Sequence, residues 1–277
     1  MRVIHAETFP RAYARAIEEV LRRPDQTKSP RGMRCREVAP LIMQFPVGAD
    51  EQGLFESPAR STDRRYLAGE MMWYYHQRDD LASISRYSKF WARVANEDGT
   101  LNSAYGRLLF ENVLEVSEWQ WAIESLAKDP DTRQAVMVIH RPMHHWHGNK
   151  DVPCTLNVAF NRRGEHLDMV VTMRSNDLWF GLPYDAPFFI SLLRNASMLL
   201  DLVPGEYTHV ALNMHAYEKD WATLERMLAD GITGPEDPMP RQELPWVNPS
   251  GNITRALALG TDPLARHMLE VSAWPRS

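Results

Sequence analysis

The chain has little cysteine and no long apolar run. Its 277 residues include two cysteines, Cys35 and Cys154, which do not make a disulfide framework. No apolar stretch approaches the roughly 18 residues that a membrane-spanning helix requires. The first twenty residues lack the apolar core of a secretory signal peptide. These absences predict a cytoplasmic protein with no membrane partner.

An excess of charge of one sign is also missing. The formal net charge is −5, which gives no reason to expect nucleic acid as a polyanionic partner. There is no internal repeat or low-complexity tract. The chain does hold 44% hydrophobic residues and nine tryptophans, which indicates a globular protein with a large core.

Residues 151–185 form the stretch that holds most of the candidate reactive and anion-binding side chains. Residues 156–160 and 166–173 alternate apolar and polar side chains as paired strands do, and residues 161–165 supply a turn. This hairpin would place Cys154 at the start of one strand and Arg174, Ser175 and Asp177 at the end of the other. An isolated cysteine is more often a small buried residue than a nucleophile, so the hairpin alone leaves both readings open.

Regular elements are expected on either side of the hairpin. Apolar spacing and capping residues predict helices over residues 8–22, 64–76, 81–91, 117–128 and in the apolar run after Asp185, a strand over 38–45, a strand leading into a helix over 208–220, and a C-terminal helix over 262–272.

Four short segments occur together in a fixed order. They are Val-Pro-Cys at 152–154, Met-Arg-Ser-Asn-Asp at 173–177, Gly-Leu-Pro-Tyr-Asp at 181–185 and Asn-Met-His-Ala-Tyr at 213–217. Their order and spacing resemble the thymidylate synthase superfamily, whose pattern is Pro-Cys, Arg-Ser-x-Asp, Gly-x-Pro-Phe-Asn and His-x-Tyr. The resemblance extends from about residue 66 to residue 220. It implies an α/β (α+β) thymidylate synthase-like fold with a large mixed sheet flanked by helices, a single catalytic domain over residues 1–277, and a homodimer.

The same resemblance implies a nucleotide site. Cys154 would be the nucleophile that adds to pyrimidine C6, and Arg174 beside it would favour the thiolate. Asp177 would touch pyrimidine O2. His215 and Tyr217, two apart and so on one face of a strand, would hold the sugar hydroxyl. The phosphate would be bound by Arg174, Ser175, Arg31 from an N-terminal basic loop, and Arg133, whose family counterpart crosses to the other subunit's phosphate.

Two points of this phosphate site are open. Arg34 and Arg36 lie in the same basic loop as Arg31, and the sequence does not choose among the three. Gln134 stands where the family has a second arginine after Arg133, which weakens one phosphate contact.

The helix predicted at 64–76 is apolar almost all round and holds Glu70. A buried carboxylate is costly unless it is paired or does chemistry. Gly-Glu-Met-Met-Trp at 69–73 is similar to the family's Glu-Leu-Leu-Trp, whose glutamate positions water and relays protons, and Tyr105 takes the place of the family's active-site tyrosine. His144, His145 and His147 lie close together, but no Cys or acidic partner stands at a metal-ligand spacing, so no metal is expected.

Asp185 is the most informative departure, because thymidylate synthases have Asn there. An Asn pairs with uracil, whereas a carboxyl accepts from the exocyclic amine of cytosine and, if protonated, donates to its N3. The exchange resembles the cytidylate hydroxymethylase branch, of the phage dCMP type or the mildiomycin CMP type. That branch moves the one-carbon unit of 5,10-methylenetetrahydrofolate to C5 and finishes with water. Thr155, where the family usually has His, and the lack of the family's apolar C-terminal tail agree with this branch.

The sequence therefore predicts a CMP or dCMP 5-hydroxymethyltransferase with a pyrimidine nucleoside monophosphate and a folate as its partners. Two alternatives stay open. One is a thymidylate synthase or uridylate hydroxymethylase with an unusual base reader. The other is a non-catalytic nucleotide-binding protein that kept the pocket. No residue identifies a partner for a 2′-hydroxyl, so ribose and deoxyribose are not distinguished.

Overall fold

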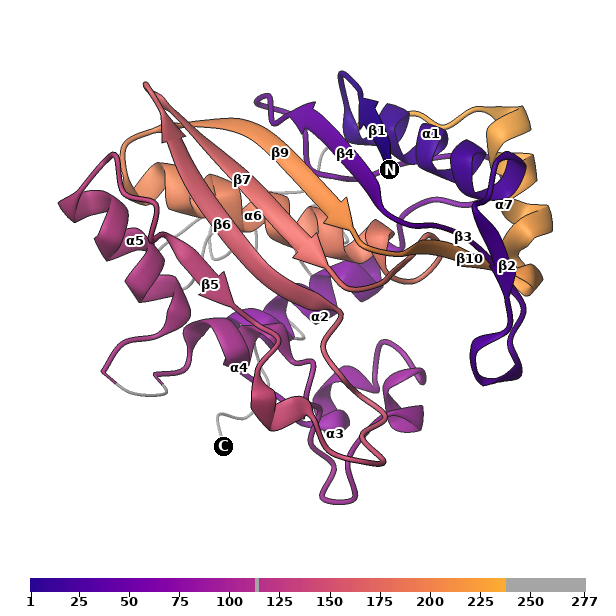
Figure 1. Ribbon diagram of the computed structural model, residues 1–277, viewed down its shortest axis with the longest axis horizontal. Coiled ribbons are helices and arrows are strands. Elements are labelled where there is room, and N and C mark those ends of the chain that lie inside the picture. The colour runs from indigo at the N-terminus through magenta and orange to yellow at the C-terminus, as the bar shows by residue number, and fades with distance from the viewer. Residues whose placement is uncertain (113–114, 238–277) are drawn as a thin grey trace. The chain divides into compact units, whose positions relative to one another are not determined.

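The computed structural model of the chain describes residues 1–112 and 115–237 (Figure 1). These residues separate into two compact units, and each is described by itself. The first consists of residues 1–62 and 154–237, and the second of residues 63–112 and 115–153. Within the described part of the chain, no helix has the length and apolar character needed to cross a membrane.

The first unit contains a mixed β-sheet. Five of its strands follow the order β1-β4-β9-β7-β6. Parallel pairs, β1 with β4 and β7 with β9, alternate with antiparallel pairs, β4 with β9 and β6 with β7. The strands are β1 (Arg2–His5), β4 (Leu41–Pro46), β9 (Val203–Ala211), β7 (His166–Met173) and β6 (Thr155–Arg163).

One face of this sheet packs against helix α6 (Leu182–Leu199). Side chains at every second position of the central strands are buried, among them Phe45, Val171 and Tyr207. The helix is apolar almost all round, as a helix enclosed by a core must be. The predicted mixed sheet with a long apolar helix after residue 185 is confirmed.

A second, smaller sheet positions the functional residues of this unit. Its order is β2-β3-β10-β8. The two-residue strand β8 (Asn176–Asp177) runs parallel to β10 (Met214–Tyr217), so residues that follow the hairpin lie beside the His-x-Tyr segment. The other two strands are β2 (Gln26–Lys28), at the edge of the sheet, and β3 (Cys35–Val38), which lies between β2 and β10.

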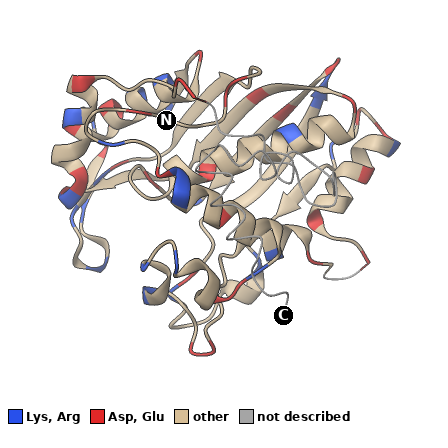
Figure 2. Cartoon of the chain, turned by 180° about the vertical axis from the view of Figure 1, so that it is seen from behind, with Lys and Arg blue, Asp and Glu red and all other residues tan. Residues whose placement is uncertain are grey.

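Two amphipathic helices complete the first unit. Helix α1 (Phe9–Arg22) buries one apolar face and packs against α7 (Glu218–Asp230). Tyr13 on α1 donates a hydrogen bond of 2.7 Å to the Leu178 carbonyl, just after β8. The outer faces of both helices carry charges of both signs (Figure 2).

The second unit is largely helical. Its elements are α2 (Arg64–Tyr75), α3 (Leu81–Ile84), α4 (Tyr105–Phe110), α5 (Glu118–Lys128) and a short strand, β5 (Val136–Val138). Asp63 caps α2 and Ser117 caps α5, each accepting a hydrogen bond from a backbone N–H of the first turn. Helices α2 and α4 approach so closely that a Cβ on Gly106 would lie 1.8 Å from the Tyr74 carbonyl oxygen. Only glycine fits there.

Two expected elements differ from the structure. The strand predicted over 38–45 is two strands, because Pro40, which has no N–H and a fixed φ, interrupts the ladder. The helix predicted over 81–91 ends at Ile84. Beyond it the chain places the Tyr87 ring tightly against Gly69 of α2, a packing contact that overrides the helical pattern. The helix predicted over 262–272 and the C-terminal tail lie outside the described residues.

Candidate active site

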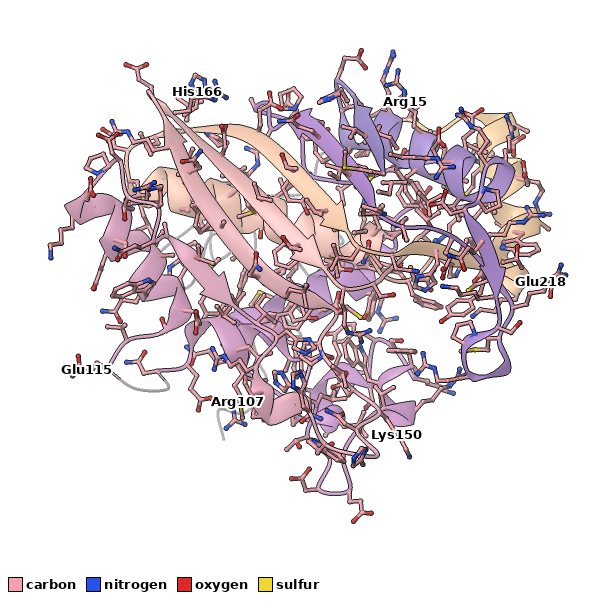
Figure 3. All side chains as sticks on the ribbon, in the orientation of Figure 1. Arg15, Arg107, Glu115, Lys150, His166 and Glu218 are labelled. Atoms are coloured by element: carbon pink, nitrogen blue, oxygen red, sulfur yellow. The ribbon has the colours of Figure 1, made fainter. Side chains whose placement is uncertain are left out.

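Cys154 and Arg174 are brought together by the β6–β7 hairpin, as the sequence predicts. Figure 3 labels His166 at the turn end of this hairpin, and Cys154 precedes β6 at the opposite end. The Arg174 amide donates to the Cys154 carbonyl at 2.8 Å, and Arg174 Nη2 lies 3.6 Å from Cys154 Sγ. Cys154 is half-buried, whereas Cys35 on β3 is fully enclosed. A guanidinium beside an accessible sulfur favours the thiolate that a nucleophilic cysteine requires.

His215 and Tyr217 lie on the same face of β10, with their ring centroids 5.1 Å apart. Ser175 Oγ lies 3.4 Å from His215 Nδ1. The pKa of His215 is lowered to about 4, chiefly by burial and to a smaller extent by the positive charges of Arg174 and Arg31, against the opposing effects of a carboxylate on β3 and a backbone hydrogen bond. The imidazole is therefore neutral at pH 7, and one ring nitrogen donates while the other accepts.

Arg31 is the N-terminal arginine that the fold directs to this face. It adopts φ = 53° in the turn that precedes β3, next to a glycine with positive φ, and its guanidinium donates a hydrogen bond to Tyr217. Arg34 pairs instead with Glu218 at 2.7 Å, at the start of α7 (Figure 3). Arg36 is stacked 4.1 Å from the centroid of an indole ring. Arg31 and Arg174 thus act on the same imidazole, and two guanidiniums near one point favour an anion.

Asp185 lies in the first turn of α6, where its amide donates to the Gly181 carbonyl at 3.0 Å. Asn176 Nδ2 donates to Asp185 Oδ2 at 2.7 Å. Asn176 is 2% exposed, and its Oδ1 is buried without a hydrogen-bond partner among the described residues. No role for Asn176 was predicted from the sequence. The signal available was its position in the Arg-Ser-Asn-Asp segment, between the candidate site residues Ser175 and Asp177.

Asp177 follows directly and is a half-buried carboxyl. Its Oδ1 accepts the Trp179 amide at 2.8 Å. Burial raises the pKa of Asp177 to about 6, against the opposing effects of that amide and of the Lys219 and Arg60 charges. Arg60 lies 3.8 Å from the Trp179 ring centroid and donates to its carbonyl at 2.7 Å. The aromatic pair 179–180 is therefore held beside a carboxyl that is partly protonated near pH 6.

Glu70, Tyr105 and Arg133 belong to the second unit. Glu70 Oε1 accepts hydrogen bonds from the hydroxyls of Tyr66 at 2.8 Å and Tyr74 at 3.3 Å. Burial raises the pKa of Glu70 to about 7, and the two tyrosine hydroxyls oppose that rise. Tyr105 stacks on Tyr74 with centroids 5.4 Å apart, so it belongs to the same buried cluster. Arg133 is exposed in the loop that leads to β5.

The histidine loop does not form a metal site in the described part of the chain. His144 is buried, and its Nδ1 accepts the Arg141 amide at 3.0 Å. His145 Nε2 lies 2.7 Å from His140 Nε2. Residues 1–112 and 115–237 contain no group of three or more His, Cys, Asp or Glu side chains arranged to hold a metal ion.

Comparison with known proteins agrees with this geometry. The chain is 28% identical over 205 residues to a deoxyuridylate hydroxymethyltransferase of Bacillus phage SP01, which covers 70% of this chain and 53% of the relative. It is 30% identical over 142 residues to a deoxycytidylate 5-hydroxymethyltransferase of Enterobacteria phage T4, which covers 50% of this chain and 56% of the relative. The chain thus spans a little over half the length of these curated relatives.

A solved structure shows the same fold. The thermostable thymidylate synthase A of Bacillus subtilis superposes with a TM-score of 0.67 at 19% identity, covering 82% of this chain and 86% of that one. The model of the family described as thymidylate synthase matches residues 11–248, which include the hairpin, the Asp185 turn and the His-x-Tyr strand. With the fold and most of its length matched, the chain belongs to the thymidylate synthase family.

Proposed function

We propose that this chain is a cytidylate 5-hydroxymethyltransferase, which acts on CMP or dCMP with 5,10-methylenetetrahydrofolate and water. The observation that carries the proposal is Asp185, held at 2.7 Å by the Asn176 amide in a family whose uridylate-binding members have Asn at this point of the Gly-x-Pro motif. A neutral carboxyl donates to cytosine N3 and accepts from the N4 amine. Uracil has a hydrogen on N3 and an oxygen on C4, so a carboxyl with its proton in this position loses both hydrogen bonds.

Cys154 begins the chemistry. Its thiolate adds to pyrimidine C6, the C5–C6 double bond opens, and C5 becomes nucleophilic. Methylenetetrahydrofolate supplies the one-carbon unit that C5 takes up. Loss of the C5 proton expels tetrahydrofolate and leaves an exocyclic methylene; water then adds to the methylene carbon, and departure of the Cys154 sulfur from C6 restores the ring double bond. The net change is cytidylate, methylenetetrahydrofolate and water to 5-hydroxymethylcytidylate and tetrahydrofolate.

Glu70 supports the proton transfers in this proposal. A carboxyl whose pKa is about 7 exchanges a proton readily at neutral pH. Its two tyrosine partners keep it oriented. We assign it to the transfer of protons to and from ordered water and the base.

Binding of the nucleotide is assigned to the remaining polar groups. Arg31, Arg174 and Ser175 take the phosphate, and neutral His215 with Tyr217 takes the sugar hydroxyl. Arg133, exposed before β5, is assigned to the phosphate of a partner subunit in a homodimer. Asp177, by its backbone or its side chain, is assigned to pyrimidine O2, and Tyr105 is assigned to substrate binding.

The first unit also contains side chains suited to binding a folate. Phe180 is 46% exposed next to half-buried Trp179 and the Asp177 carboxyl. Aromatic faces and a carboxyl at one place fit a flat ring that carries an amino group. We therefore place the pterin among these residues.

A second candidate is a uridylate hydroxymethyltransferase, which the alignment with the phage SP01 enzyme favours. One experiment separates the candidates. The purified chain is incubated with methylenetetrahydrofolate and equimolar CMP, dCMP, UMP and dUMP, and the products are read by mass spectrometry. A gain of CH2O on a cytidylate is expected. A gain of CH2O on dUMP establishes the second candidate, a gain of CH2 on dUMP means a thymidylate synthase, and no change supports a binding protein.

A further inference from the structure

The Asn176 side chain has a nitrogen that donates a hydrogen bond and a buried oxygen that accepts none from the described residues. Nδ2 donates to Asp185 Oδ2 at 2.7 Å, while Oδ1 has no partner among the described residues. A buried unpaired carbonyl is destabilising, and a position that keeps one in spite of that penalty is a candidate for ligand contact. Because both atoms belong to one planar amide, this acceptor lies immediately beside the Asn176–Asp185 hydrogen bond.

The backbone around Asn176 holds the amide in this position. The Asn176 N–H donates to the Asn213 carbonyl at 2.8 Å, and β8 pairs with β10 through Met214. A Cβ on Gly181 would lie 2.7 Å from Asn176 Nδ2 and 3.0 Å from backbone atoms of residue 177. The absence of a side chain at Gly181 therefore leaves the space through which the amide reaches Asp185.

The direction of this hydrogen bond constrains the protonation of Asp185. An amide nitrogen only donates, so Oδ2 is the acceptor of this bond. Because a carbonyl oxygen accepts better than a hydroxyl oxygen, the bond favours the form of the neutral carboxyl whose proton is on Oδ1. Oδ2 can still accept from an amine, and Oδ1–H can donate to an unprotonated ring nitrogen. That is the pattern of an aminopyrimidine edge.

We propose that Asn176 is a specificity-determining residue, which fixes the Asp185 carboxyl in the pattern that reads an aminopyrimidine and accepts the amine's second hydrogen at Oδ1. This inference rests on the proposed cytidylate specificity. A uridylate brings its C4 oxygen towards two acceptors, Oδ2 of Asp185 and Oδ1 of Asn176, and is disfavoured by both. The discrimination is shared by two residues on different elements, β8 and α6.

Calorimetric titration of the full chain with dCMP, CMP and dUMP tests this pair. Asn176→Ala is expected to lower the ratio of cytidylate to uridylate affinity by about tenfold to a hundredfold, because each unpaired polar contact in a buried site is worth about that factor. Asn195→Ala is the matched control, since Asn195 is equally buried on α6 and donates to the Ser191 carbonyl. It should leave the ratio unchanged.

Two more variants and a second control distinguish specificity from folding. Asn176→Asp places two carboxyls at hydrogen-bonding distance, where like charges retain one proton to higher pH, so the pH dependence of dCMP affinity should move to higher pH. Gly181→Ala should lower the affinity ratio as Asn176→Ala does, while Gly48→Ala, where a Cβ meets nothing within 4 Å, should not.

The outcomes separate the two proposals. If the wild-type chain prefers dUMP, the proposed function is overturned whatever the variants do. If the wild-type chain prefers a cytidylate and Asn176→Ala changes the affinities for dCMP and dUMP by the same factor, the role of Asn176 alone is overturned.

Discussion

Arg174 is joined to Cys154 twice, through its backbone amide at 2.8 Å from the Cys154 carbonyl and through a guanidinium nitrogen 3.6 Å from the sulfur. The first contact belongs to the hairpin and fixes the distance between the two residues. The second is an electrostatic contact with the reacting atom. A strand pairing thus sets the environment of the thiol, and the same guanidinium lies near enough to His215 to lower its pKa.

Replacing Cys154 by Ala should abolish turnover, by at least about a thousandfold, because no other group supplies the covalent step. Nucleotide affinity should change little, since the phosphate and sugar contacts remain. Product formation by mass spectrometry and titration with dCMP measure the two effects. Cys35→Ala is the control, because Cys35 is a buried core residue. Full turnover by the Cys154 variant would contradict the mechanism.

Asp185→Asn should exchange the preferred base. An amide donates to uracil O4 and accepts from N3–H, so we expect dUMP affinity to rise and cytidylate affinity to fall, with a combined change in the ratio of about a hundredfold. The Asn176 amide can still donate to the new carbonyl, so the fold should be retained. Competition binding with both nucleotides measures the ratio, and an unchanged ratio would show that Asp185 does not read the base.

Glu70 should make stability depend on pH. Its pKa is raised from 4.5 to about 7 in the folded chain. Below about pH 4.5 the carboxyl is protonated in both states. Between pH 4.5 and 7 the unfolded chain releases the proton while the folded chain keeps it, so the free energy of unfolding falls, by about 3 kcal/mol from this group.

Urea unfolding at several pH values checks this. Glu70→Gln should remove that part of the pH dependence, so that the variant gains stability relative to wild type as the pH rises from 5 to 8. Glu7→Gln, at an exposed position on the surface, is the control and should follow the wild-type curve. Parallel curves for wild type and Glu70→Gln would show that folding does not raise the pKa of Glu70. Turnover of Glu70→Gln should be lost at every pH if the residue relays protons.

The phosphate site should depend on Arg31 and not on Arg34. Arg31→Ala is expected to weaken dCMP binding about tenfold or more, because a charge-assisted contact to phosphate is lost. Arg34→Ala should have little effect, since Arg34 is occupied by the exposed pair with Glu218. Titration with the nucleoside in place of the nucleotide is the discriminating measurement: there Arg31→Ala should cost nothing. An equal loss for nucleoside and nucleotide would place Arg31 elsewhere.

The sequence predicted most of the elements and several pairwise relationships of the site. The hairpin follows from alternation, and because residues two apart on a strand share a face, His215 and Tyr217 were expected together. The choice of Arg31 over Arg34 and Arg36 was not predictable, since it depends on an ion pair with Glu218 and a stacked indole, both contributed by a helix nearly 200 residues away in sequence. Asn176 was missed for a similar reason. Its partner is set by the entry of α6 at Gly181, which is a packing relationship and leaves no periodic signal.

Strand β9 has a consequence for the order in which this protein is made. It lies between β4 and β7 and is the last of the five strands in that row to leave the ribosome. Until residues 203–211 emerge, β1 with β4 and the β6–β7 hairpin are two separate pieces, and pairings such as Met43 with His209 must close a loop of more than 160 residues. Contacts so distant in sequence form slowly. Nascent chains that stop before residue 203 therefore expose unpaired strand edges, which are sites of aggregation.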